Sequence, residues 1–304
     1  MFIIKYRKIF YALSGILIAM SVAALLVWGL NLGIDFKGGA IVEVSYPEGR
    51  PEIDAVKVNL DKLSLGAYSL QPAGGDGFIL RSRMINDAER PLVQESFSLK
   101  NAKKIEIKRF NSVGPILGKE AATKSMISLF IVIFCIVIFI SFAFRKVSEP
   151  VSSWKYGFVA IIALLHDVLV PTGVFAVLGH YYGYEVDTLF VTALLVVLGF
   201  SVHDTIVVFD RVRENLNLSK GHREKNSFDK IVGQSVSQTF VRSINTSLTT
   251  ILALAALYIF GAESTRHFSL ALIVGITAGT YSSIFLGSPL LVTLEKWQSR
   301  KNSD

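Results

Sequence analysis

The stretch GFSVHDTIVVFDRVREN, Gly199–Asn215, ends a long apolar run and carries an acid where a lipid-facing helix should have none. Asp204 lies about five residues, roughly 7–8 Å along a helix, before the run gives way to charged residues. A charge at the bilayer centre costs about 2.5–3.5 kcal/mol on insertion scales, so intramembrane acids face a bundle interior and mark a pathway or an ion pair. The stretch therefore predicts a membrane protein with a functional site inside the bilayer.

The overall composition favours the same class. Of the 304 residues, 51% are hydrophobic, which is high for a soluble chain of this length. The net charge of +7 is explained by basic loops that face a cytoplasm and anionic lipid. Nucleic acid is not an expected partner, because no basic face interleaved with aromatic residues is present. The single cysteine, Cys135, excludes an intrachain disulfide.

Six apolar segments are long enough, at about 20 residues, to cross the hydrocarbon core. They are Tyr11–Leu30, Met126–Phe144, Gly157–Leu178, Thr188–Phe209, Ile244–Phe260 and Phe268–Leu291. The first follows basic residues as a signal peptide would, but its run is too long and five more spans follow. We therefore interpret it as an uncleaved first helix.

The spans divide the chain into four parts. Residues 1–30 form a cytoplasmic N-terminus and the first helix, and residues 31–125 form an external domain. Residues 126–295 form a five-helix region that contains a cytoplasmic loop at 210–236, and residues 296–304 form a cytoplasmic tail.

The distribution of basic residues orients the chain. The short segments on the side of both termini carry 15 Lys and Arg, whereas the two short loops on the other side carry only Arg266. Cytoplasmic loops hold the excess of Lys and Arg, so both termini are expected in the cytoplasm. The long connection over residues 31–125 is basic too, but long loops translocate largely regardless of charge.

The external segment has the pattern of a small α+β domain. AIVEVSY (Ala40–Tyr46) and KKIEIKRF (Lys103–Phe110) alternate as strands do, and Pro51 opens a helical pattern. A Gly-rich hairpin at Gly74–Gly77 joins two more strands, and Asn86 is the N-cap candidate of a second helix. The order strand–helix–strand–strand–helix–strand is the ferredoxin-like unit. It holds no catalytic constellation, so its expected role is binding or spacing.

Arg242 is the expected partner of Asp204. It lies about five residues into the fifth span, which runs antiparallel to the fourth, so the two charges match in depth. Thr246 follows Arg242 at i+4 and suggests a hydrated or hydrogen-bonded interior. The pair has two interpretations. It is a static pair that fixes helix register, or it is a proton site whose carboxylate releases its partner when protonated.

Two adjacent His–Asp pairs lie in the spans: His166 with Asp167, and His203 with Asp204. Two histidines and two carboxylates are possible zinc ligands. Within each pair, however, the side chains point about 100° apart on a helix, and no metal-ligand motif supports them. We expect no metal site, and we keep His166 and Asp167 as secondary candidates for a proton relay.

The sixth span carries Gly275, Gly279 and Ser283 at four-residue spacing. Small residues at that spacing let two helices approach closely. The stripe therefore predicts close helix packing, either within this chain or against a partner.

Three long motifs carry a resemblance to a known family. They are GIDFKGG (Gly33–Gly39), GFSVHDTIVVFDRVREN (Gly199–Asn215) and FSLALIVGITAGTYSSIFLGSPLLV (Phe268–Val292). In order and position the chain resembles the SecF family, the smaller members of the SecD–SecF pairs that assist bacterial protein export. The match covers nearly the whole chain.

The resemblance implies half of an RND-superfamily helix bundle in the bacterial inner membrane. It implies a SecD partner, association with the SecYEG channel, preproteins as cargo, and export assisted by the proton gradient with no other cofactor. The family's essential acid falls on Asp204 and its fifth-span arginine on Arg242. His203 departs from the family, where Asn usually stands. It could titrate near neutral pH and join the relay, or only donate a hydrogen bond.

Three classes of function are consistent with an acid inside the bilayer. The first is an export subunit coupled to the proton gradient. The alternative is half of an RND-type small-molecule exporter, but one external domain of about 90 residues is too small for a substrate tunnel. The third is an intramembrane enzyme, for which only the weak His–Asp pairs are available. We expect the export subunit and no enzyme activity.

Overall fold

The structure is a computed structural model and describes residues 2–144, 153–220, 227–261 and 263–301. The chain forms two compact units, one made of Leu32–Met126 and one made of the segments on either side of it. The sequence placed the external domain at residues 31–125. Each unit has its own hydrophobic core.

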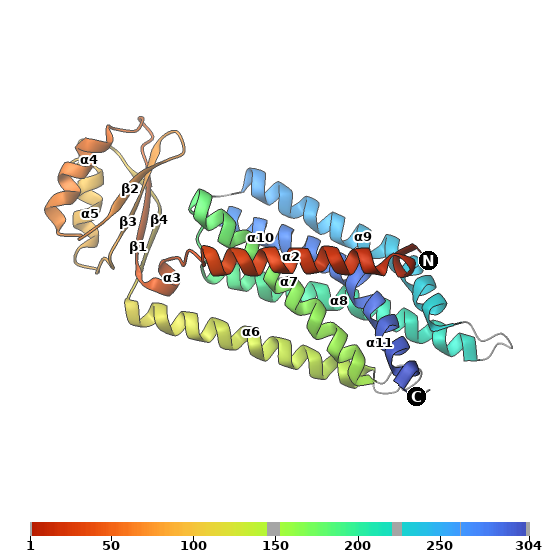
Figure 1. The fold of residues 1–304 in the computed structure, drawn as a ribbon. Coiled ribbons are helices and arrows are strands. Elements are labelled where there is room, and N and C mark those ends of the chain that lie inside the picture. The colour runs from red at the N-terminus through yellow and green to blue at the C-terminus, as the bar shows by residue number, and fades with distance from the viewer. Residues whose placement is uncertain (1, 145–152, 221–226, 262, 302–304) are drawn as a thin grey trace. The chain divides into compact units, whose positions relative to one another are not determined.

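The small unit is a four-stranded antiparallel sheet covered on one face by two helices (Figure 1). The strands are β1 (Gly39–Ser45), β2 (Ser69–Ala73), β3 (Gly77–Ser82) and β4 (Glu106–Val113), in the order β2-β3-β1-β4. The helices are α4 (Ile53–Leu60) and α5 (Arg90–Phe97), with a short α3 (Ile34–Lys37) before β1 and a 3-10 turn, η1 (Asp61–Leu63), after α4. This is the predicted ferredoxin-like arrangement.

The core of the small unit lies between the sheet and its two helices. Val56 and Leu60 of α4 are fully buried against Phe78 and Leu80 of β3, because they share one face of the helix. Asn86, the predicted N-cap, lies in the turn before α5, whose N-cap is Glu89. The Asn86 side chain accepts from the Glu89 N–H at 2.9 Å, and the Glu89 carboxylate accepts from the Asn86 N–H at 3.1 Å, which is the reciprocal pattern of a capping box.

Six helical segments of the described chain are long and apolar enough to cross a membrane. They are α2 (Arg7–Val27), α6 (Pro115–Ala143), α7 (Ser153–Tyr182), α8 (Thr188–Lys220), α9 (Phe228–Phe260) and a last span built from α10 (Glu263–Tyr281), the π-helix η2 (Ser282–Gly287) and α11 (Ser288–Lys301). A short helix, α1 (Phe2–Lys5), precedes α2. The predicted fold class is therefore confirmed.

The helices are longer than the apolar runs that predicted them. The expected loop at 210–236 is helical at both ends, since α8 continues to Lys220 and α9 begins at Phe228. The expected tail at 296–304 likewise begins inside α11, which continues to Lys301. Residues 221–226 and 302–304 of these segments lie outside the described residues. Hydropathy marks where a helix leaves hydrocarbon, whereas the helix itself continues through residues that favour it.

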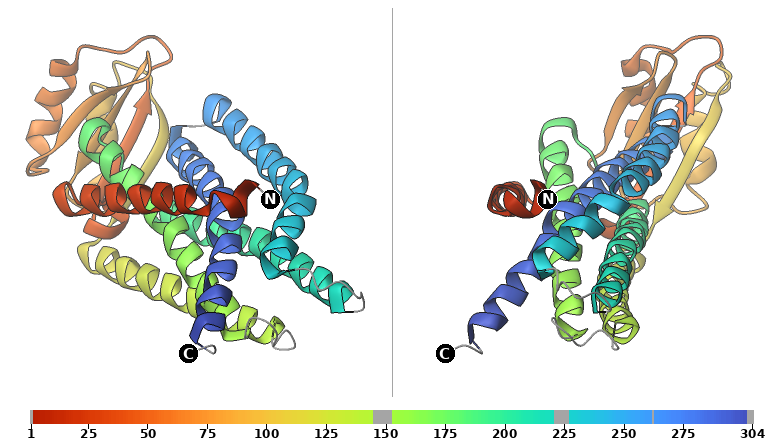
Figure 2. Two further views of the ribbon diagram at one scale, coloured as in Figure 1. Left: turned by 45° about the vertical axis from the view of Figure 1, so that its right-hand side comes forward. Right: turned by 90° about the vertical axis from the view of Figure 1, so that its right-hand side faces the viewer.

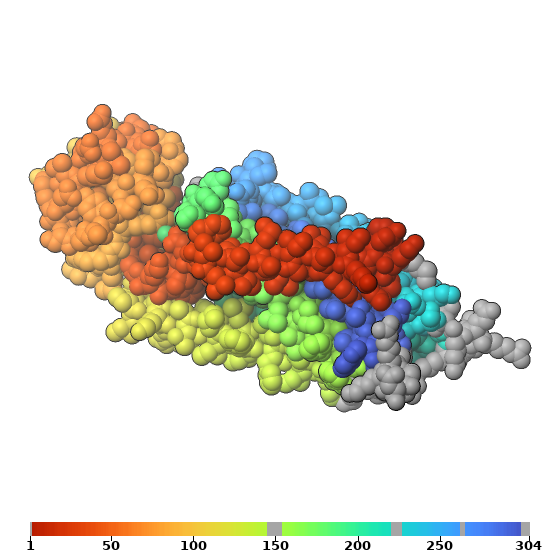
Figure 3. Space-filling view, in the orientation of Figure 1, coloured from red at the N-terminus to blue at the C-terminus, as the bar shows by residue number. Residues whose placement is uncertain are grey.

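Helix α10 is the centre of the helical unit, where it packs against α7, α8 and α9 (Figure 2). The predicted stripe of small residues permits this packing within the chain itself. A Cβ at Gly275 would lie 2.3 Å from a methyl group of Val197 on α8. Helix α2 instead lies along the surface, with one whole side uncovered (Figure 3).

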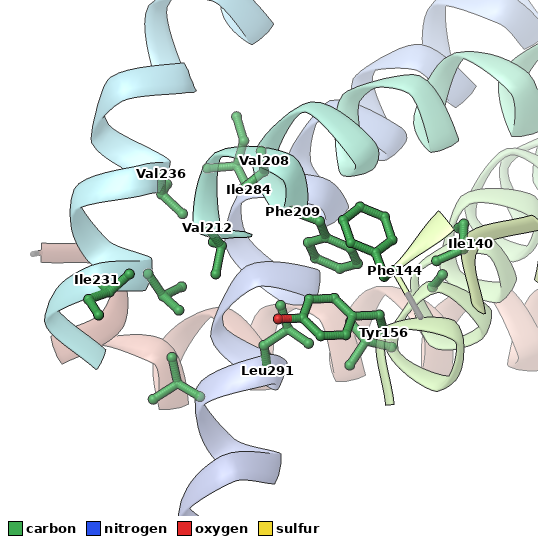
Figure 4. Close-up of a cluster of buried hydrophobic side chains, with 14 of the residues drawn as sticks. Ile140, Phe144, Tyr156, Val208, Phe209, Val212, Ile231, Val236, Ile284 and Leu291 are labelled. Carbon is green, nitrogen blue, oxygen red and sulfur yellow. The ribbon is translucent and has the colours of Figure 1, made fainter. Parts of the chain in front are cut away.

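Aromatic rings join three segments at one end of the helical unit. Phe144, Tyr156 of α7 and Phe209 of α8 meet with ring centroids 5.2 Å to 5.9 Å apart (Figure 4). The start of α2, the end of α8, the start of α9 and the end of α11 all lie at one end of this unit (Figure 1).

The crossing of α2 and α7 gives a testable packing constraint. A Cβ at Gly173 of α7 would lie 2.4 Å from Cα of Ser21 on α2. We expect Gly173→Ala to destabilise the helical unit by about 1–3 kcal/mol, because the helices must separate. The measurement is the Tm of the full chain in detergent. Gly15→Ala in α2 is the control: nothing lies within 4 Å of that position, so its Tm should stay equal or rise. Equal Tm values for both variants would contradict a tight crossing.

Candidate functional site

Asp204 lies in α8 and is buried, with 3% of its surface exposed. Its Oδ2 atom has no hydrogen-bond partner among the described residues. The next residue, Thr205, is also buried and shares a hydrogen bond of 2.8 Å with Ser283 of η2. A buried carboxylate oxygen without a partner carries a large desolvation cost, which binding of a proton or a water would reduce.

The expected ion pair between Asp204 and Arg242 is not formed within this chain. Among the described residues, no carboxylate lies within 4.0 Å of the Arg242 guanidinium, and that side chain is exposed on α9. Arg242 projects from an uncovered side of its helix. It still lies near enough to interact electrostatically with the Asp204 carboxylate.

His203 does not share the burial of Asp204. It is exposed, because adjacent residues of a helix point about 100° apart. It too lies within electrostatic reach of the Asp204 carboxylate. Arg242 and His203 are thus two exposed cationic or titratable groups beside one buried acid.

His166 and Asp167, the secondary candidates, belong to a fully buried polar cluster of the helical unit. Both are 0% exposed, and His166 Nδ1 lies 2.9 Å from Asp167 Oδ1. The other carboxylate oxygen accepts from Ser201 of α8 and, at 2.8 Å, from Ser282 of η2. Asp167 therefore joins α7, α8 and the last span.

Only one of the two His166 ring nitrogens, Nδ1, has a hydrogen-bond partner among the described residues. Its Nε2 atom is buried without a hydrogen-bond partner among the described residues. The ring stacks on Tyr281 with centroids 5.9 Å apart, and the Tyr281 hydroxyl donates to the Phe10 carbonyl at 3.0 Å. The His166–Asp167 hydrogen bond, the stacking of His166 on Tyr281 and the hydrogen bond from Tyr281 to Phe10 therefore connect Asp167 to α2.

Ser201 and Ser282 were not among the residues that the sequence suggested. Serine is common in helices and carries no distinctive signal. The available clue was position: Ser201 lies three residues before Asp204, and Ser282 and Ser283 lie at the end of the small-residue stripe. Those two serines begin the π-helix η2, a rare form that occurs frequently at functional sites.

Thr246 is not directed at Asp204. Its hydroxyl donates to the Arg242 carbonyl of its own helix at 2.9 Å. The cross-helix contact of this region is made by Ser247, which shares a hydrogen bond of 2.5 Å with Thr280 of α10.

No group of three or more His, Cys, Asp or Glu side chains within the described ranges is placed to hold a metal ion.

Comparison with known proteins gives the family. A family model described as protein export membrane protein SecD/SecF, C-terminal, matches residues 93–297, and one described as the SecD/SecF GG motif matches residues 23–46. The protein translocase subunit SecF of Thermobaculum terrenum is 43% identical, over 96% of this chain and 93% of the relative. The chain belongs to the SecF family. The SecF subunit of Anaerolinea thermophila is 38% identical, over 98% of this chain and 95% of the relative.

Solved SecDF structures share the fold of this SecF-family chain. SecDF from Thermus thermophilus, described as a translocon-associated membrane protein, has a TM-score of 0.78 and 28% identity over 96% of this chain. A second, SecDF in a super-membrane-facing form, has a TM-score of 0.62 and 26% identity over 99% of this chain. The chain spans 38% and 39% of those SecDF chains. These relatives are export proteins, so a small-molecule exporter is not favoured.

The Asp167 cluster gives a second prediction. Ser282→Ala removes one of the two hydroxyls that donate to the Asp167 carboxyl, so we expect a loss of about 1.5–3 kcal/mol in the free energy of unfolding. Thermal unfolding of the full chain in detergent measures it. The control is Thr277→Ala in α10, whose exposed hydroxyl donates only to the Ile273 carbonyl of its own helix; its effect should stay within about 0.5 kcal/mol. A similar loss in both variants would show that the cluster does not hold the helices together.

Proposed function

We propose that this chain is a SecF subunit in which protons bound at Asp204 drive conformational changes that assist preprotein export. In this proposal it works with a SecD partner at the SecYEG channel. The observation that carries the proposal is the Asp204 carboxylate, buried in a spanning helix with an unpartnered oxygen. Protons are the proposed coupling ion, and no catalytic activity is proposed.

Protonation changes the interactions of Asp204 in a defined way. The ionised carboxylate attracts the nearby Arg242 guanidinium, whereas the neutral acid does not. Because Thr205 and Ser283 share a hydrogen bond, a movement of α8 at Asp204 also displaces the last span. The π-helix at that contact is the proposed element with two arrangements.

The energy available is sufficient for such a switch. One elementary charge that crosses 100 mV supplies about 2.3 kcal/mol. That energy changes the ratio of two conformations by about fiftyfold, since each 1.4 kcal/mol is a factor of ten. The transfer of one proton is therefore sufficient to shift the equilibrium between two conformations of the helical unit.

The uncovered side of α9 supports a partner in the membrane. Arg242, Asn245 and Thr249 are exposed there although α9 is apolar enough to span a bilayer. Charged and amide side chains that face lipid are costly, so this side needs a protein or water-filled neighbour. We propose that SecD supplies it, as the larger extent of the SecDF chains suggests.

The proposed location is the bacterial inner membrane, with both termini in the cytoplasm. The basic short segments adjoin the start of α2, the start of α7, the end of α8, the start of α9 and the end of α11, and these helix ends lie at one end of the helical unit. The excess of Lys and Arg favours the cytoplasm for that end. The small unit then lies on the opposite side of the membrane, where exported chains emerge.

The first test is Asp204→Asn, which removes the titratable group and keeps its size. We expect the variant to insert and to assemble with SecD, but to lose the gradient-dependent part of export. Export of a reporter preprotein from cells or into inverted vesicles, with and without an uncoupler, measures this.

Asp210→Asn is the matched control for that test. Asp210 lies on the same helix but is exposed and pairs with Arg213 at 3.2 Å. Its export should respond to the uncoupler as the unchanged protein does. Normal gradient-dependent export in Asp204→Asn would end the proton-site proposal.

The second test concerns the partner side of α9. With Cys135→Ser as the background, Asn245→Cys is expected to form a cross-link to SecD with a short cysteine-to-amine or photoactivated reagent. Leu13→Cys on the exposed apolar side of α2 is the control, because that side needs no partner. A higher-mass band from both positions in equal yield, or from neither, would argue against α9 as the partner side.

A further inference from the structure

A cavity of about 800 Å³ lies where α1, α2, α9 and α11 meet. This volume is within the roughly 300–1,000 Å³ of small-molecule sites. The cavity belongs wholly to the helical unit, and neither Asp204 nor Asp167 lines it. It therefore has no part in the proton site proposed above.

Basic side chains dominate the polar lining. Lys5, Arg7, Lys8 and Lys296 line the cavity, against one acid, Asp229. Lys296 is paired with Asp229 at 3.2 Å. Within the described ranges, no carboxylate lies within 4.0 Å of the three other cations, so the cavity holds an excess of positive charge.

The walls of the cavity are held in place by contacts between helices. The Tyr11 hydroxyl shares a hydrogen bond of 2.9 Å with Thr293 and so ties α2 to α11. The Lys296–Asp229 pair ties α11 to α9. Ile4 of α1 is buried in the core of the helical unit, which anchors the turn that carries Lys5. The cations are therefore brought together before any ligand binds.

The position of the cavity favours a lipid over a soluble anion. Its charged residues lie at the ends of three candidate spans: the start of α2, the start of α9 and the end of α11. Span ends lie at the depth of lipid headgroups. The lining also includes Phe2, Tyr6 and Ile9, whose apolar side chains are exposed beside the cations. Phosphate-binding cations next to apolar surface match a headgroup with its acyl chains.

We propose that this cavity binds the headgroup of an anionic phospholipid. The phosphodiester lies among Lys5, Arg7 and Lys8, and the acyl chains follow the exposed apolar side of α2. Asp229 opposes the ligand and holds Lys296. The bound lipid fills the space between the first, fifth and last spans at the end of the helical unit where the basic residues lie.

The test is lipid binding by the full chain in detergent, followed by native mass spectrometry with phosphatidylglycerol, phosphatidylcholine or inorganic phosphate. We expect phosphatidylglycerol to bind at least about tenfold more tightly than phosphatidylcholine. Millimolar inorganic phosphate should not displace it, since phosphate lacks the acyl chains. Equal binding of the two lipids, or full displacement by phosphate, would overturn the proposal.

Variants assign the binding to this cavity. Lys5→Gln with Lys8→Gln should weaken phosphatidylglycerol binding by about 25-fold, at about fivefold for each charge removed. The matching Lys5→Arg with Lys8→Arg variant should keep it. Asp229→Asn should tighten binding by about fivefold, because it removes the opposing charge. A gain of affinity cannot result from a folding defect.

Lys230→Gln is the matched control. Lys230 is exposed next to Asp229 but does not line the cavity. It should leave the affinity for phosphatidylglycerol unchanged. If Lys230→Gln weakens binding as much as the cavity variants do, the lipid recognises general surface charge and the proposed site is wrong.

Discussion

The arrangement of the helical unit depends on the cost of leaving a polar group without a partner in hydrocarbon. Asp167 has a partner for each carboxylate oxygen: His166 on its own helix for one, and serine hydroxyls from α8 and η2 for the other. Asp204 is also buried, with 3% of its surface exposed, but its Oδ2 atom has no hydrogen-bond partner among the described residues. The first acid joins three spans, and the second keeps an unpartnered oxygen, on which the proposed proton site rests.

The small residues and the hydroxyls act together. Gly275 lets α10 approach α8 closely, and this approach brings Ser283 within reach of Thr205. In water such hydroxyl contacts contribute little, but in a bilayer a separated pair would face lipid. The helices are thus held by short polar contacts at the points of closest approach, and the apolar surface that remains is free to face lipid or a partner.

Much of the fold was predictable because it depends on periodicity. The alternating strands, the hairpin at Gly74–Gly77 and the two helical patterns predicted the ferredoxin-like unit, and the apolar runs predicted the six spans. The direction of Arg242 was not predictable, since depth along a helix says nothing about rotation around it. Ser201 and Ser282 were missed because a hydroxyl gains its importance only from the helix it meets. The extent of α8 to Lys220 was missed because hydropathy reports the bilayer and not the helix end.

The first and last strands of the small unit are neighbours in its sheet, with Gly39 opposite Val113. The polypeptide consequently goes into this domain and comes out of it at one place, as in a module inserted into a host protein. An insertion with adjoining ends can change in size, or be exchanged for another, while the segments that precede and follow it keep their own pairing. The small unit and the helical unit are therefore able to evolve at separate rates, under separate selection.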